Sequence, residues 1–237
     1  MTLRVLISNS TLPLQPEWRA LLNVYLLTMI FLAVLGNSLV VYATSKFNAI
    51  HLDSGSVLLV QNLALTDMSL IVVAYVPKVL TLLVGSWVLG PMLCYITAFL
   101  QFIPGAGEIL TLTCIAGYRC FLVRFPFRAH PKVSSTKLLI CLIWISACVS
   151  PVVFMSANKS QAIFDIRTLG CVTNVALHHK SLVLFVLFAF GIIPVLLTVM
   201  FNLYTLLLSV RYTSCQKKGR ASPRSHNRQA VVSGPLS

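Results

Sequence analysis

Two acidic residues lie inside long apolar segments: Asp67 within residues 56–84 and Glu108 within residues 92–123. If these segments cross a bilayer, a charged side chain near its centre costs at least about 2.5–3.5 kcal/mol. Two acids that share a low-dielectric site cannot both ionise cheaply, so either one stays protonated or a cation lies between them. The pair therefore predicts a sodium- or proton-sensing site, or else a neutral hydrogen-bonded pair that joins helices together with Asn37.

The residue types that do chemistry in enzymes form no catalytic pattern here. His178 and His179 are adjacent, but they stand near no serine or cysteine nucleophile motif, and the sequence has no glycine-rich phosphate loop. We therefore expect no enzyme, and no metal or cofactor beyond a sodium ion at Asp67.

The elements that must position the two acids are long apolar helices. Hydrophobic residues make up 57% of the 237 residues and charged residues only 10%, with a mean hydropathy of +0.88. At about 1.5 Å per residue, each apolar run is long enough to cross or nearly cross a hydrocarbon core of about 30 Å. A soluble core is excluded, because too little polar sequence remains to cover such helices. The sequence predicts an all-α polytopic membrane bundle with five transmembrane helices, at about 20–44, 56–84, 92–123, 138–156 and 181–210.

The basic residues predict which way the bundle faces. The chain carries 18 Lys and Arg against 5 Asp and Glu, and with the amino terminus outside most of the basic residues fall on the inner side. This orientation predicts an extracellular amino-terminal segment over 1–19, a transmembrane bundle over 20–210 and a basic, disordered cytoplasmic tail over 211–237. The glycosylation sequons at Asn9 and Asn158 then lie outside. The net charge of +13 is thus a topology signal, and no nucleic-acid partner is expected.

Four further residues lie outside the middle of the membrane: Cys94, Lys78 and Arg119 near the ends of predicted helices, and Cys171 in the outer loop between the fourth and fifth helices. Cys94 and Cys171 both fall on the outer, oxidising side, which is compatible with a disulfide between them. Lys78 lies near the outer end of its helix and Arg119 near the inner end of another. Either residue could extend to the lipid headgroups as an anchor, or serve a function there.

Read in order, a set of motifs between about Gly36 and Tyr204 resembles the rhodopsin-like (class A) G protein-coupled receptors. The set comprises Gly36-Asn37 for the family's GN, Asn62 to Asp67 for NLAxxD, Trp87 to Gly90 for WxFG, Cys94 and Arg119 at the spacing of the disulfide cysteine and the DRY arginine, and Pro126, Trp144, Cys171 and Pro194. The resemblance implies the fold of a seven-helix receptor in the plasma membrane. Its partners would be an extracellular ligand, a heterotrimeric G protein and membrane lipids.

The resemblance also implies roles for single residues. Asp67 would be the family's sodium-binding carboxylate, and Glu108 stands where the family usually places a small polar residue beside that ion. Cys94 and Cys171 would form the family's disulfide. Arg119, with Pro126 in the second inner loop, would contact the G protein.

The chain departs from the family pattern in two places. Where the family has Asp-Arg-Tyr, this chain has Tyr118-Arg119-Cys120, so Arg119 lacks the adjacent acid that normally restrains it, and basal activity or altered coupling is expected. After Val210 no further apolar run follows, so we expect a receptor truncated after its fifth helix. Such a product would not signal by itself and would act by pairing with full-length receptors.

The predicted ligand is a peptide. Gln101 stands where the family's amine receptors carry an aspartate, which disfavours an amine. Gln101 and Phe102, with Lys78 on the second helix, resemble the vasopressin-like and galanin-like peptide receptors, and we expect these three residues to contact the ligand. The alternative function is an ion or proton transporter or channel that uses Asp67 and Glu108.

Overall fold

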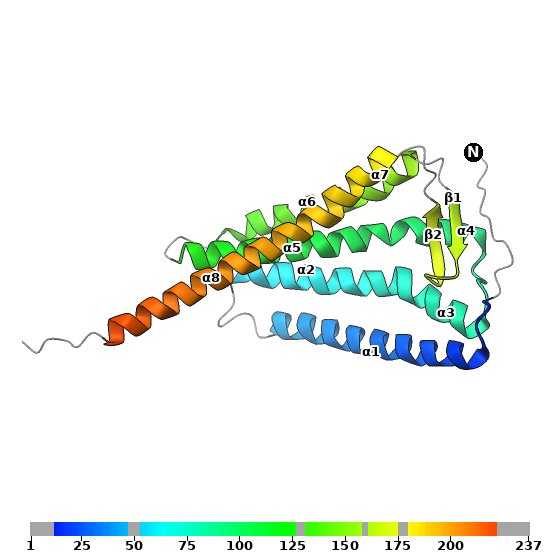
Figure 1. Cartoon of the computed structure of the whole chain (residues 1–237), viewed down its shortest axis with the longest axis horizontal. Coiled ribbons are helices and arrows are strands. Elements are labelled where there is room, and N and C mark those ends of the chain that lie inside the picture. Colours follow the sequence, from blue (N-terminus) through cyan, green and yellow to red (C-terminus); the bar gives the residue numbers. More distant parts are fainter. Residues whose placement is uncertain (1–11, 47–52, 127–130, 158–160, 175–179, 222–237) are drawn as a thin grey trace, which may run out of the picture.

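The computed structural model describes residues 12–46, 53–126, 131–157, 161–174 and 180–221, and it forms an elongated helical bundle (Figure 1). Five helical stretches are long and apolar enough to cross a membrane, as the sequence predicts. In chain order the elements are α1 (Pro16–Lys46), α2 (Ser54–Leu70), η1 (Ile71–Tyr75), α3 (Val76–Val84), α4 (Gly90–Leu100), α5 (Phe102–Arg124), α6 (Val133–Ala157), β1 (Gln161–Asp165), β2 (Gly170–Asn174), α7 (Lys180–Leu187), η3 (Phe188–Ile192) and α8 (Ile193–Ala221).

The observed helices extend beyond the predicted apolar runs. The first begins at Pro16 and ends at Lys46, because polar residues at the ends of a helix can lie in the headgroup region. The last continues to Ala221, so residues 211–221 are helical where we had predicted disorder. Lys, Arg and Gln are good helix formers, which explains why the helix outlasts its apolar stretch.

Three of the spans are irregular, and each irregularity lies just before a proline. A proline cannot donate to the carbonyl four residues earlier, and its ring crowds that carbonyl. The π-helical turn η1 precedes Pro77, and the π-helical turn η3 precedes Pro194. Pro104 comes shortly after the break at Gln101 that separates α4 from α5, whereas α6 continues through Pro151 without interruption.

Helix α5 lies at the centre of the bundle and packs against α2, α6 and α8, while α1 packs against α2 and α3 (Figure 1). Most large apolar side chains of α1 and α8 are exposed, as expected for helices that face lipid. The residues buried between helices are often small or polar. Four of them, Ala64, Thr66, Thr111 and Ala147, each have 1% or less of their surface exposed. Small and hydroxyl side chains allow membrane helices to approach closely.

A β-hairpin, which the sequence did not predict, lies over one end of the bundle (Figure 1). Strands β1 and β2 pair antiparallel, with Phe164 opposite Cys171. Both strands contact α4. The chain before α1 comes to the same region, because the Leu12 backbone N–H donates to the Gly85 carbonyl at 2.8 Å. We call the end of the bundle that carries the hairpin the outer end, and the opposite end the inner end.

Candidate functional site

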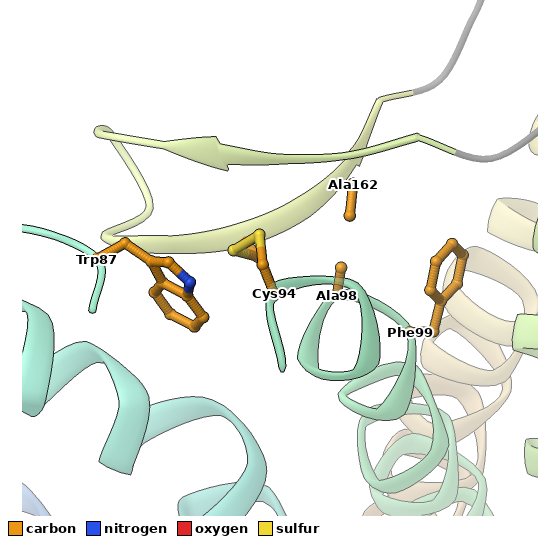
Figure 2. Close-up of a cluster of buried hydrophobic side chains, with 6 residues drawn as sticks. Trp87, Cys94, Ala98, Phe99 and Ala162 are labelled. Atoms are coloured by element: carbon orange, nitrogen blue, oxygen red, sulfur yellow. A yellow bond between two sulfur atoms is a disulfide. The ribbon is translucent and has the colours of Figure 1, made fainter. Parts of the chain in front are cut away.

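The outer end is held by a disulfide between Cys94 and Cys171, which confirms the predicted pair. Cys94 lies in the first turns of α4 and Cys171 on β2, with their Cα atoms 5.2 Å apart. Both are buried in a cluster with Trp87, Ala98, Phe99 and Ala162 (Figure 2). The Trp87 indole donates to the Gly90 carbonyl at 2.9 Å, which fixes the turn that leads into α4. The hairpin is therefore attached to the bundle both covalently and by apolar packing.

Gln101 and Phe102 lie together on the wall of a cavity of about 460 Å³ between α5, α6 and the α7–η3 stretch. The Gln101 amide donates to the Cys171 carbonyl at 3.1 Å, across 70 residues of sequence. Gln101 thus connects the wall of the cavity to the hairpin. The rest of the lining is mostly apolar, with Ser150 as a further polar residue on the α6 side.

Lys78 does not line this cavity, although we expect it to contact the ligand together with Gln101 and Phe102. Its Nζ lies 5.3 Å from the centre of the Tyr75 ring. Its methylene chain passes beside Gly170 of the hairpin, since a Cβ built on Gly170 would lie 3.6 Å from Lys78 Cε. Lys78 is therefore a residue beneath the hairpin and not part of the Gln101–Phe102 wall.

The predicted sodium or proton residues do come together. Asn37 of α1, Asp67 of α2 and Glu108 of α5 line one cavity of about 240 Å³, whose other walls are largely apolar. The three side chains are close enough to interact, Asn37 with Asp67 and Asp67 with Glu108. The amide of Asn37 also donates to the Ala33 carbonyl at 3.0 Å within its own helix. Carboxylate and amide oxygens of this kind are ligands that a hard cation prefers.

Midway along the bundle, one amide connects three helices. The Nδ2 of Asn62 on α2 donates to Thr111 Oγ1 on α5 at 2.9 Å. Trp144 Nε1 on α6 donates to Asn62 Oδ1, also at 2.9 Å. From the sequence, Asn62 and Trp144 were expected only as motif residues and Thr111 was missed. The available signal was a threonine within an apolar helix; the structure shows that it has no exposed surface.

At the inner end, Arg119 is exposed and lines a cavity of about 260 Å³ together with Tyr118 and residues of α1 and α2. Tyr118 is partly buried, and its hydroxyl donates a hydrogen bond to Asp53 Oδ2. Pro126 is exposed just beyond the end of α5. Asp53 was not expected as a site residue from the sequence, although an aspartate before a helix is a known capping signal.

The two predicted glycosylation residues, Asn9 and Asn158, lie outside the described residues.

Comparison with known proteins identifies one family. The profile of the 7 transmembrane receptor (rhodopsin family) matches residues 36–233. Among similar proteins, rhodopsin of Sphodromantis sp. is 33% identical over 56% of this chain and 35% of its own length. The neuropeptide Y receptor type 2 of Homo sapiens is 30% identical over 65% of this chain and 41% of its own. The QRFP-like peptide receptor of Branchiostoma floridae is 25% identical over 64% and 40%, respectively.

Among solved structures, squid rhodopsin has the same arrangement of helices. The TM-score is 0.73 at 16% sequence identity, and the match covers 88% of this chain and 57% of the squid protein. At this identity the likeness concerns the fold alone. The chain spans less than half the length of the three relatives named above.

Proposed function

The chain belongs to the seven-transmembrane receptor (rhodopsin) family, and we propose that it takes a peptide on its outer side and contacts a heterotrimeric G protein on its inner side. The observation that carries the proposal is the family match over residues 36–233. It is supported by a disulfide-linked hairpin next to a cavity at one end, and by an exposed arginine at the other. A multi-pass membrane location follows from the family and from five apolar helices.

Two observations support a peptide ligand. Two of the similar proteins are receptors for peptides by name, the neuropeptide Y receptor type 2 and the QRFP-like peptide receptor. Gln101, in place of an acid, offers a neutral amide at the cavity wall, so a ligand amine would find no carboxylate from that residue. A cavity of about 460 Å³ has room for a few side chains of a bound peptide, with Phe102 as an aromatic contact.

Lys78 would contact the ligand separately from Gln101 and Phe102. Because it lies beneath the hairpin, it would reach a part of the peptide that passes between β2 and the start of α3. Its charge favours an acidic residue or a carboxylate at that point of the ligand.

The cavity between Asn37, Asp67 and Glu108 would hold a sodium ion or a shared proton. A cation there neutralises two acids that the bilayer otherwise makes costly. This proposal accounts for the presence of the second acid, Glu108, on the helix that faces Asp67.

The inner end would contact the G protein through Arg119, with Pro126 in the adjoining loop. With this end in the cytoplasm, the amino terminus and the hairpin lie outside, and the plasma membrane is the proposed location. Asn9 and Asn158 would then be glycosylated. The basic residues of the inner side support this orientation.

The ligand proposal is tested by binding labelled peptides to membranes that contain the full chain. Replacing Phe102 with alanine is expected to lower peptide affinity about tenfold, since a buried aromatic contact is worth at least about 1.5 kcal/mol. Lys78→Ala is expected to weaken only peptides with an acidic residue. Phe185→Ala is the matched control, because Phe185 on α7 is 61% exposed and is not among the residues that line the cavity. A protein that bound no peptide but bound a lipid would contradict the proposal.

The coupling proposal is tested by capture of a purified heterotrimeric G protein on the reconstituted chain. Arg119→Gln should reduce capture, and Lys46→Gln, at the inner end of α1, should not. Equal capture by both variants would contradict a role for Arg119.

A further inference from the structure

The inner end of α5 is joined to the start of α2 by a hydrogen bond between Tyr118 and Asp53. Asp53 caps α2: its Oδ2 accepts from the backbone N–H groups of Gly55 at 3.0 Å and of Ser56 at 3.3 Å. The Tyr118 hydroxyl donates to the same oxygen. One carboxylate therefore satisfies the first turn of α2 and binds a neighbouring helix, and hydrogen bonds to a charged acceptor are among the stronger ones.

The junction is packed too closely to be a chance approach of two surface side chains. A Cβ built on Gly55 would lie 2.5 Å from the Tyr118 hydroxyl oxygen and 2.9 Å from Thr136 Oγ1. Gly55 is buried, and Thr136, near the start of α6, is only 4% exposed. The inner ends of α2, α5 and α6 thus meet at a position where only glycine leaves enough room.

Arg119 is the next residue of α5 after Tyr118, so its side chain leaves the helix about 100° further round. Both residues line the inner cavity of about 260 Å³. Within the described part of the chain, no hydrogen bond or ion pair holds the Arg119 side chain. Its position consequently depends on where the backbone of α5 is held, and Tyr118 is the adjacent point of attachment.

We propose that Tyr118 and Asp53 are positioning residues: their hydrogen bond holds the inner end of α5 against the start of α2 and so fixes where Arg119 is presented to a cytoplasmic partner. The acid that restrains this end of α5 is Asp53, the N-cap residue of α2, and it acts through the hydroxyl of Tyr118. It is not adjacent to Arg119 in the sequence. The proposal rests on the proposed function only in the identity of that partner. The hydrogen bond itself can be tested without it.

Cys120, one residue beyond Arg119, and Cys114, deeper in the same helix, are free thiols and serve as built-in probes. The full chain is reconstituted in lipid nanodiscs and treated with a charged, membrane-impermeant maleimide, and labelling is measured at each cysteine by mass spectrometry. Tyr118→Phe removes only the hydroxyl and should raise the labelling rate of Cys120 about tenfold, which is the factor that one net hydrogen bond supplies. The Cys114 rate should not change.

Three further test variants and two control variants keep the experiment decisive. Asp53→Ser preserves a capping oxygen but shortens the side chain, and should raise Cys120 labelling as Tyr118→Phe does. Adding Tyr118→Phe to Asp53→Ser should raise the labelling no further, because the bond is already lost. Gly55→Ala should act in the same direction by steric displacement, whereas Gly36→Ala is its control, since a Cβ built on Gly36 meets nothing within 4 Å. Tyr42→Phe, at a tyrosine of α1 that is 60% exposed, is the control for loss of a hydroxyl.

Unchanged Cys120 labelling in Tyr118→Phe, or strictly additive effects in the double variant, would overturn the proposal. A parallel rise at Cys114 would also overturn it, because a general loss of packing would then explain the result. Capture of a purified heterotrimeric G protein, measured separately, addresses the proposed function: failure of every variant and the parent to capture it would contradict contact with a G protein and leave the labelling result intact.

Discussion

Replacing Asn62 with alanine removes both hydrogen bonds by which α2 connects α5 and α6 in the middle of the bundle. The bonds run to Thr111 and from Trp144, each at 2.9 Å. Thr111 keeps its own donation to the Gly107 carbonyl at 2.6 Å, so its hydroxyl proton remains satisfied. The Trp144 indole N–H, in contrast, loses the acceptor that Asn62 provides.

The magnitude follows from the number and surroundings of these bonds. A hydrogen bond between membrane helices contributes about 0.6 kcal/mol on average and about 1.7 kcal/mol at most. Loss of the two bonds therefore lowers the free energy of unfolding by about 1.2 kcal/mol, with a ceiling near 3.4 kcal/mol. Asn62 is only 7% exposed, so water cannot readily replace the missing amide, and we expect a value in the upper half of that range.

The assay is reversible unfolding of the purified chain in mixed micelles with an increasing fraction of dodecyl sulfate, followed by tryptophan emission. Ser69→Ala is the matched control, because the Ser69 hydroxyl, also on α2, donates to the Leu65 carbonyl of its own helix. Its effect should stay within about 0.5 kcal/mol. A double variant of Asn62→Ala with Trp144→Phe should fall short of additivity by about 1.2–1.7 kcal/mol, the value expected for the bond that both changes remove. The reasoning is refuted if Asn62→Ala costs no more than Ser69→Ala, or if the two changes are additive.

Three other outcomes are expected in the same unfolding assay. Sodium at about 150 mM, compared with choline, should stabilise the chain by about 0.8 kcal/mol if the dissociation constant is about 50 mM, and Asp67→Asn should abolish that gain; equal stability in both salts would argue against a sodium site. Replacing Cys94 and Cys171 with serine should cost up to about 4.5 kcal/mol, because their bond closes a loop with a sequence separation of 77; no loss of stability would contradict a stabilising link. Thr113→Val removes the contacts of the Thr113 hydroxyl with Thr198 Oγ1 at 2.9 Å and with the Pro194 carbonyl at 3.0 Å, both between α5 and α8, and should cost about 0.6–1.7 kcal/mol; a neutral result would contradict a stabilising role for these contacts.

The five spans could be predicted because their signal is local. Hydropathy over a window of helix length decides whether a segment enters a bilayer, and no distant contact is needed. The ends were less predictable: α1 begins at Pro16 and α8 continues to Ala221, because helix formation does not stop where apolar character stops. The hairpin over 161–174 was missed, since its short strands are stabilised by a bond to Cys94 far earlier in the chain.

The candidate sites divide in the same way. The proximity of Asp67 and Glu108 could be predicted, because acids inside apolar helices must turn toward the bundle. The position of Lys78 beside Gly170 of the hairpin could not, because the hairpin is held over the bundle by a bond between two cysteines 77 positions apart.

By itself, then, the sequence determined which segments cross the membrane, which residues are costly there and which family motifs the chain carries, because each depends on residue type and short-range spacing. Only the tertiary structure decided which polar groups meet. Tyr118 and Asp53 stand 65 positions apart, and Trp144 and Asn62 stand 82 apart. The partner of each group is set by how the helices rotate and pack against one another, and that arrangement depends on contacts along the whole length of the bundle.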